Sequence, residues 1–316
     1  MRQIISTEPR LTSPADAGRV ADFIIAWLKE REYGLNLPSR RVLAARVEAF
    51  ARSRPGCQLY WEHDDGLHAT CSIQRRATGS GAQALVQLRV GDDSIRHGAI
   101  EDVVDRALAH AAEVAPEAEI AVLLPNGDPV ESQLVARGFS PLMALVTMTR
   151  ALRDDIVVNA PPEVIIRPLV PGLDEDAYAS VQHDAFSSDP LGSGLTADDI
   201  RHQIDLGIAR PSDFFLAMRE GTLVGVARSL FDGDGLNPDG GPFAEILGNG
   251  VLESYRRHGI GQALMRAQSR HLRDLGATSA CLTVLSARPE LVAHYAKIGF
   301  DETGRQTIWS RTQPDQ

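Results

Sequence analysis

The chain has 316 residues, a formal net charge of −10 and 43% hydrophobic residues. That length predicts two domains of ordinary size, and an acidic chain without a long basic run excludes a nucleic-acid-binding surface. Its three cysteines form no C-x-x-C pair, and their odd count does not fit a disulfide framework. The N-terminus lacks a signal-peptide pattern and the apolar run at residues 23–28 is too short to span a bilayer, so we expect a cytoplasmic protein without a membrane partner.

Two short motifs occur twice with the same spacing. The tripeptide Arg-His-Gly at residues 96–98 recurs at 257–259, an offset of 259 − 98 = 161. Gly138 and Phe139 recur as Gly299 and Phe300, again at 299 − 138 = 161. Each copy of the tripeptide opens an amphipathic stretch, at residues 100–114 and 260–275. The chain is therefore predicted to be a tandem duplication.

The boundary between the two copies is predicted from composition. Residues 152–162 carry two adjacent aspartates and a Pro-Pro pair, which are typical of a linker. The first copy would then occupy residues 1–151 and the second residues 163–316.

The second copy shows alternating strand and helix patterns. Thr196 followed by Asp199 predicts a helix start, and Gly276 predicts a helix end. Strands are predicted at residues 164–167, 214–219, 223–231, 244–252, 280–285 and 303–311, and helices at 174–186, 196–207, 261–275 and 290–298. This order predicts an α/β fold with a mixed sheet flanked by helices, in which strands 244–252 and 280–285 are parallel neighbours.

A strand, a glycine-containing loop and a helix start follow one another at residues 244–264. Gly259 and Gly261 let the backbone approach an anion, and the helix N-terminus supplies amides and positive potential. Arg256, Arg257 and His258 add cationic or donor groups. The pattern R-x-x-G-x-G predicts a pyrophosphate cradle, although the same pattern also fits an ordinary tight turn.

The run V-x-x-x-Y-R-x-x-G-x-G-x-A-L at residues 251–264 resembles the acetyl-CoA-binding motif of the GCN5-related N-acetyltransferase superfamily. The later H-Y-A-K-I-G-F at residues 294–300 resembles the closing motif of that superfamily. The resemblance implies two tandem domains, each a twisted mixed sheet flanked by helices, with acetyl-CoA as co-substrate and no metal. It also implies a set of cofactor-binding residues: Val251, Leu252, Arg256, Arg257, His258, Gly259, Ile260, Gly261, Gln262 and Arg288.

Two residues are predicted to carry the chemistry. Glu245 lies on the strand before the cradle, where the resemblance implies a general base that deprotonates the attacking amine. Tyr295 stands where the resemblance implies a general acid that protonates the departing thiolate. An ordinary strand glutamate and a half-buried helix tyrosine are the alternative interpretations. The amides of Val251 and Leu252 are the candidates for stabilising the oxyanion.

The first copy lacks these residues. At the 161-residue offset, Glu245 corresponds to Ala84 and Tyr295 to Leu134. The same offset places Ile95 opposite Arg256 and Ile100 opposite Gly261, so bulky side chains would fill the cofactor position. We expect a degenerate first half that packs against the second and helps to shape the acceptor pocket.

The predicted function is transfer of an acetyl group from acetyl-CoA to a primary amine of a small molecule. Alternatives are a non-catalytic acyl-CoA sensor and a related acyl transfer, such as that of mycothiol synthase, another tandem member of the superfamily. Residues 187–195 and 232–242 are expected to face the acceptor, and either to bind a cationic amine or to be solvated loops. Their candidate carboxylates are Asp189, Asp232, Asp234 and Asp239.

Overall fold

The computed structural model describes residues 8–30, 37–63, 66–78, 81–96, 98–153, 157–187, 195–237 and 240–311. The first half contains β1 (Arg10–Leu11), α1 (Ala17–Glu30), α2 (Arg40–Ser53), β2 (Gln58–His63), β3 (Gly66–Thr78), β4 (Gly81–Val90), α3 (Asp92–Arg96), α4 (Ile100–Val114), β5 (Glu119–Pro125), α5 (Val130–Ala136) and β6 (Phe139–Ala151). The second contains β7 (Val164–Pro168), α6 (Glu175–Phe186), α7 (Ala197–Asp205), β8 (Phe214–Arg219), β9 (Thr222–Leu236), β10 (Pro242–Val251), α8 (Ile260–Asp274), β11 (Ser279–Leu285), α9 (Pro289–Lys297) and β12 (Asp301–Arg311).

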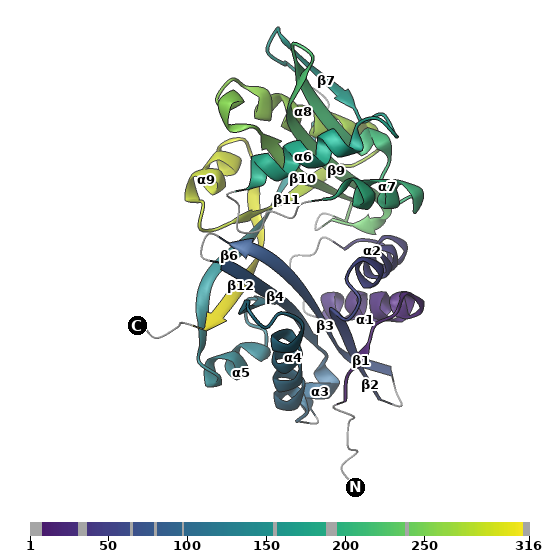
Figure 1. Cartoon of the computed structure of the whole chain (residues 1–316), viewed down its shortest axis with the longest axis vertical. Helices are drawn as coiled ribbons and strands as arrows, with labels where there is room; N and C mark the ends of the chain where they lie inside the picture. The colour runs from purple at the N-terminus through teal and green to yellow at the C-terminus, as the bar shows by residue number, and fades with distance from the viewer. Residues whose placement is uncertain are drawn as a thin grey trace.

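Within the described ranges, twelve strands form one mixed sheet that runs through both halves. Its order is β1-β2-β3-β4-β5-β12-β6-β11-β10-β9-β8-β7. The last strand of each half is exchanged, since β12 pairs with β5 and β6, and β6 pairs with β11 and β12. The yellow β12 is seen crossing into the lower half in Figure 1. The two halves are therefore joined by backbone hydrogen bonds as well as by packed side chains.

The two halves repeat the same elements at nearly constant spacing. The starts of β4 and β10 differ by 242 − 81 = 161 residues, and those of α4 and α8 by 260 − 100 = 160. The predicted element order of the duplication is confirmed. One correspondence is wrong by a residue: Ile100 and Ile260 both begin their helices, so Ile100 does not stand opposite Gly261.

The predicted elements of the second half are all present, and their ends shift by only a few residues. The Thr196 and Asp199 side chains cap α7 reciprocally, with Asp199 N donating to Thr196 Oγ1 at 3.1 Å. Strands β10 and β11 are parallel neighbours, as predicted. Strand β9 extends five residues past its predicted end, from 231 to Leu236, because it pairs with β10 beyond the predicted range.

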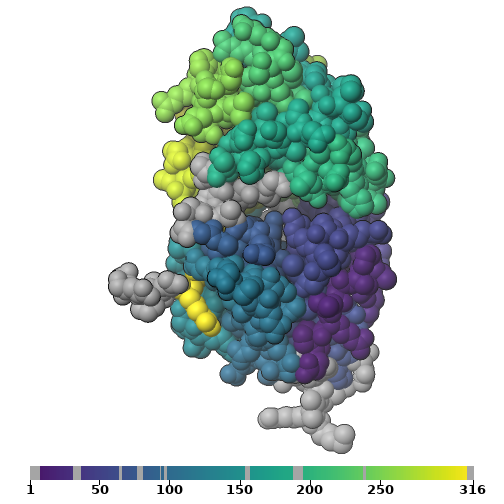
Figure 2. All heavy atoms as spheres, viewed as in Figure 1, coloured from purple at the N-terminus to yellow at the C-terminus, as the bar shows by residue number. Residues whose placement is uncertain are grey.

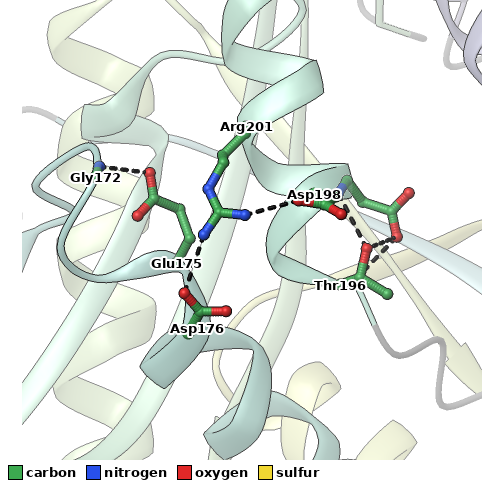
Figure 3. Close-up of polar contacts among 7 residues, drawn as sticks. Gly172, Glu175, Asp176, Thr196, Asp198 and Arg201 are labelled. Carbon is green, nitrogen blue, oxygen red and sulfur yellow. Dashed lines mark hydrogen bonds and ion pairs between the residues drawn. The ribbon is translucent and has the colours of Figure 1, made fainter.

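Helices cover both faces of the second half's sheet. On one face, Ile260 and Leu264 of α8 pack against Val224 and Ala227 of β9. On the other face, α6 packs onto the sheet through Tyr178, and α7 packs through Ile200. Helix α6 is fixed to α7 by Arg201, which pairs with Asp176 at 3.0 Å and Asp198 at 2.7 Å, and Glu175 accepts from Gly172 N (Figure 3). Helix α6 itself lies against β10, where Phe186 and Ala185 are next to Gly250.

Helix α2 of the first half docks onto the second half. Val42 packs with Leu230 and Phe243, and Asp232 Oδ2 accepts a hydrogen bond of 2.6 Å from Ser39 N at the helix start. A Cβ on Gly235 would meet Leu37 O at 2.6 Å, so the approach of the two halves requires a glycine there. Helix α2 lies beside α7 (Figure 1), and the two halves are in contact along this face (Figure 2). The first half is thus packed directly against the second.

None of the helices among the described residues is long and apolar enough to cross a membrane. In the same described ranges, no three His, Cys, Asp or Glu side chains are grouped so that they could hold a metal ion.

Candidate active site

Strands β10 and β11 separate soon after they meet. Their parallel pairing has a single register pair, Glu245 with Cys281. A bulge in β10 between Leu247 and Gly250 shifts its register against β9, and such bulges bend the strand and strengthen its twist. The facing edges of β10 and β11 beyond Glu245 therefore form an opening in the sheet.

Glycines make this bulge possible. Gly248 has φ +47°, a region that favours glycine. A Cβ on Gly250 would lie 2.7 Å from Phe186 Cε2 and 2.9 Å from Ala185 Cβ of α6. The absence of side chains at both positions lets α6 close one side of the opening.

A cavity of about 530 Å³ fills this opening and reaches the start of α8. Its walls come from α6, β10 and its following loop, β11 and α9. Six of the predicted residues lie in its lining: Val251, Arg256, Arg257, Gly261, Arg288 and Tyr295. The sequence motifs and the strand opening therefore meet at one site.

The other predicted residues lie outside the described lining of this cavity: Glu245, Leu252, His258, Gly259, Ile260 and Gln262. The Ile260 side chain is 1% exposed and packs in the core, so only its backbone can face a ligand. His258 is exposed at the loop. Their roles as ligand contacts stay predictions.

The N-terminus of α8 has no side-chain cap among the described residues. Gly259 is its N-cap with φ +80°. Arg257 also has a positive φ, +64°, so the loop turns sharply before the helix begins. The first intrahelical bond is donated by Ala263 N to Gly259 O at 3.0 Å. Since the first helical turn has no acidic residue, the amides of residues 260–262 and the helix dipole suit an anion.

Two side chains brace the loop rather than point freely into the cavity. Arg256 donates from Nε to Val251 O and from Nη2 to Ala185 O, both at 3.0 Å. Asn249 Nδ2 donates to Gly261 O at 2.9 Å, and its buried Oδ1 has no partner in the described structure. The first arginine of the R-x-x-G-x-G pattern thus ties the loop to β10 and α6.

The expected oxyanion donors are only partly available. Leu252 N donates to Val224 O at 3.0 Å, so its amide belongs to the β9–β10 ladder. A backbone donor already paired in a ladder cannot also stabilise an oxyanion without breaking that bond. The expectation for the Leu252 amide is therefore wrong, and Val251 stays a prediction.

Glu245 stands where the opening begins, on the face of β10 opposite α8. Its side chain is 18% exposed and its Oε2 lies 3.4 Å from Nη2 of Arg46, which comes from α2 of the first half. Arg228 of β9 lies on the same face, opposite Leu247 in the register. The candidate base is therefore surrounded by arginines from both halves.

Tyr295 faces the cavity from α9 on the other side of the opening. Its ring packs edge-to-face on Phe300, with the centroids 5.8 Å apart. Burial raises the pKa of the Tyr295 hydroxyl above the usual value of 10.0. A phenol held protonated in this way fits a proton donor. Burial likewise raises the pKa of Cys281, which makes this strand cysteine a poor nucleophile.

Sequence reasoning missed several residues of the site. Gln182, Asn249 and Thr283 line the cavity. The Gly-Asn-Gly sequence at 248–250 is a bulge signal that could have indicated the strand opening. Arg46 had no such signal, because it is 199 residues from Glu245 in the chain.

The predicted acceptor loops are only partly described. Asp189 and Asp239 lie outside the described residues. Asp234 is exposed, whereas Asp232 is 1% exposed and accepts from the Ser39 amide. Asp232 therefore holds α2 in place and does not present a free carboxylate at the surface.

Comparisons with known proteins agree with this geometry. Residues 180–300 match the model of the Acetyltransferase (GNAT) family. A mycothiol acetyltransferase of Catenulispora acidiphila is 32% identical over 183 residues, which is 57% of this chain and 58% of that protein. One of Thermomonospora curvata is 29% identical over 75% of this chain and 76% of that protein. The chain thus spans little more than half of the first relative and three quarters of the second.

Solved structures resemble the whole chain. A GCN5-related N-acetyltransferase from Sphaerobacter thermophilus has a TM-score of 0.67 at 19% identity, with 98% of this chain and 97% of that chain covered. A tandem GNAT protein from the clavulanic acid biosynthesis pathway has a TM-score of 0.64 at 14% identity, covering 98% and 99%. At such identities the likeness shows the fold alone, and it extends over both halves.

Proposed function

We propose that this chain, which belongs to the GCN5-related N-acetyltransferase (GNAT) family, transfers the acetyl group of acetyl-CoA to a primary amine of a small molecule. The observation that carries the proposal is the continuity of the strand opening with the uncapped N-terminus of α8. An extended arm can pair with the free edge of β10 while its diphosphate binds the helix amides.

Acetyl-CoA fits the residues present. The backbone amides of residues 260–262 would hold the diphosphate, with Arg257, His258 and Arg288 as neighbouring donors. Leu252 would contribute packing through its side chain, which contacts the cluster around Val226. The Gly261 position leaves space, since a Cβ there would meet nothing closer than 3.7 Å. Acetyl-CoA is thus the proposed co-substrate.

In the proposed mechanism, Glu245 accepts the proton of the attacking amine, directly or through a water. A neutral amine is required, because an alkyl ammonium with a pKa near 10.4 has no lone pair to attack the thioester. Tyr295 donates its proton to the departing CoA sulfur from the α9 side. Support comes from their positions on opposite sides of the opening, Glu245 at its start and Tyr295 in its lining.

The first half, residues 1–151, is proposed to be a domain without a cofactor site, joined by linker 152–162 to the catalytic domain 163–316. Ala84 and Leu134 are fully buried in its core, where the second half has Glu245 and Tyr295. Residues 154–156 of the linker lie outside the described residues. The contribution of the first half would be made through α2.

A second candidate is a mycothiol-type acceptor. It is favoured by the two relatives, both of which are called mycothiol acetyltransferase. The reaction class would be the same, and only the amine would differ. Deacetylated mycothiol is therefore a necessary member of any acceptor panel.

The test is release of free CoA from acetyl-CoA in the presence of a panel of amines. The proposal predicts amine-dependent release that falls steeply in Glu245→Gln. Tight binding of acetyl-CoA without release by any amine would instead indicate a sensor. No binding of acetyl-CoA would refute both.

A further inference from the structure

Building on the proposed function, we propose that the acceptor is an amino acid whose free carboxylate lies close to its amine. Glu245 takes the amine, and Arg46 from the first half takes the carboxylate. The proposal rests on the position of Arg46, on a buried arginine beside it whose Nε has no partner in the described structure, and on the opposite charges of Arg46 and Glu245.

Arg46 comes from α2, a helix that packs against the second half. It lies four residues after Val42, so both side chains leave α2 on the same face. Val42 is fully buried against Leu230 and Phe243, while Arg46 reaches 3.4 Å from Glu245. Its side chain is 38% exposed. Arg46 is therefore fixed at its base and open to an incoming ligand at its tip.

A second guanidinium lies behind this pair. Arg228 is 8% exposed, its Nε has no partner in the described structure, and it stacks over Phe214 at 5.2 Å. The neighbouring Tyr178 hydroxyl is buried and also without a partner there. Burial, and then the charge of Arg46, lower the pKa of Arg228 to about 10. A polar ligand or an ordered water would satisfy such donors, since leaving them unsatisfied is costly.

The charged groups around this pair are of both signs. Asp213 accepts from His271 at 2.7 Å and its charge also acts on Arg228, and Asp232 accepts from the Ser39 amide at 2.6 Å while its buried Oδ1 has no partner in the described structure. Arg46 is the guanidinium in contact with Glu245. A ligand that brings one charge of each sign can pair with both members of this ion pair, whereas a simple alkyl ammonium can pair only with Glu245. Arginine also binds carboxylates with good geometry.

The spacing restricts the acceptor further. Arg46 Nη2 and Glu245 Oε2 are 3.4 Å apart. The ligand's carboxylate, which binds Arg46, and its amine, which binds Glu245, must therefore also lie close together. An amine and a carboxylate separated by one or two carbons satisfy this condition. A polyamine does not, nor does the N-terminus of a peptide, whose nearest carbonyl is an uncharged amide.

The experiment compares matched acceptors by CoA release with acetyl-CoA. Each standard amino acid is paired with its carboxamide and with the amine that lacks the carboxyl group. At least one amino acid is expected to exceed both partners by roughly tenfold or more in kcat/KM, mainly through a lower KM. The carboxamide has the less basic amine, so its larger neutral fraction works against this expectation and makes the comparison conservative.

The matched variants locate the effect. Arg46→Gln is expected to raise KM for the amino acid about tenfold and to raise KM for the carboxamide much less, whereas Arg46→Lys should keep part of the preference. Arg41→Gln is the control, because Arg41 lies on the same helix but donates to Gly207 O. An unchanged thermal unfolding midpoint, or the retained activity of Arg46→Lys, shows that α2 remains docked.

The outcomes separate the two proposals. Equal acetylation of acids, carboxamides and plain amines would refute the amino-acid acceptor and leave the transferase intact. A uniform fall in kcat for every acceptor in Arg46→Gln would also refute it, since that result would reduce Arg46 to orienting Glu245. If CoA were released with none of the amines, the proposed function would be refuted, and the amino-acid acceptor would be refuted with it.

Discussion

The two halves of the chain share one fold, but one pair of strands differs between them. In the first half, β4 and β5 stay paired over five consecutive positions, from Gln83–Glu119 to Gln87–Leu123. In the second half, β10 and β11 pair at a single position, Glu245–Cys281. Strand β4 has no register shift against β3, whereas β10 has a bulge against β9. The cavity between β10 and β11 therefore opens where the strand bends, whereas β4 and β5 stay paired.

The helix that follows differs in charge. The first turn of α4 contains Glu101 and Asp102, and that of α8 contains no acid. Ahead of α4, Ile95 of α3 packs against the first half's core, where the second half has its arginine-containing loop. Acids at a helix N-terminus stabilise the helix but repel a diphosphate. We infer that the same duplicated scaffold is closed to a ligand in the first half by the pairing of two strands and by two acidic residues at the helix start.

The largest effect is expected when Glu245 is replaced by alanine, the residue at the corresponding position 84 of the first half. Glu245→Ala, and the isosteric Glu245→Gln, should lower kcat for amine-dependent CoA release by about 10²- to 10⁴-fold, the range for loss of a general base. Acetyl-CoA affinity should stay unchanged. Glu253→Gln is the control, because Glu253 lies in the exposed turn before α8. Similar rates in all three variants would remove Glu245 from the mechanism.

The next effect concerns Tyr295, whose counterpart is Leu134. Tyr295→Phe should slow turnover by roughly tenfold or more. Since burial raises the pKa of Tyr295, the phenol stays protonated up to pH 10 and the donor is lost only as pH rises through the higher value. The wild-type kcat profile should therefore fall above pH 10, and the Phe variant should lack that fall. Tyr60→Phe, a matched change in the first half, should alter neither the turnover rate nor the pH profile of kcat.

A smaller effect is expected from importing the acids of α4. The double substitution Gly261→Glu with Gln262→Asp should weaken acetyl-CoA binding about tenfold, or ~1.4 kcal/mol, in a calorimetric titration. Arg270→Glu changes the net charge by the same amount further along α8, at an exposed position. It should have little effect. Equal weakening by both changes would point to overall charge rather than to the helix start.

The smallest effect concerns the bulge itself. Gly250→Ala should lower the free energy of unfolding by about 1 kcal/mol, because the new Cβ overlaps Phe186 and Ala185. Phe186→Leu should recover part of that loss in chemical denaturation. If Gly250→Ala were as stable as wild type, α6 would not pack as closely on β10 as described.

Much of the fold and part of the site could be predicted from local sequence. Thr196 with Asp199 and Gly259 before α8 are local signals, and the structure has a helix start at each. The bulge was not predicted, because Gly248 and Gly250 form it only against β9 and α6. The exchange of β6 and β12 and the Arg46–Glu245 contact depend on pairing between distant segments, which local periodicity does not contain.

The most direct test of the account is a crystal structure of the protein with acetyl-CoA. We expect one molecule per chain, with its diphosphate within hydrogen-bonding distance of the amides of residues 260–262. Its thioester should lie in the opening near the Glu245–Cys281 pair. A ligand bound beside β4 and α4, or a cavity between β10 and β11 without ligand at saturating acetyl-CoA, would contradict it.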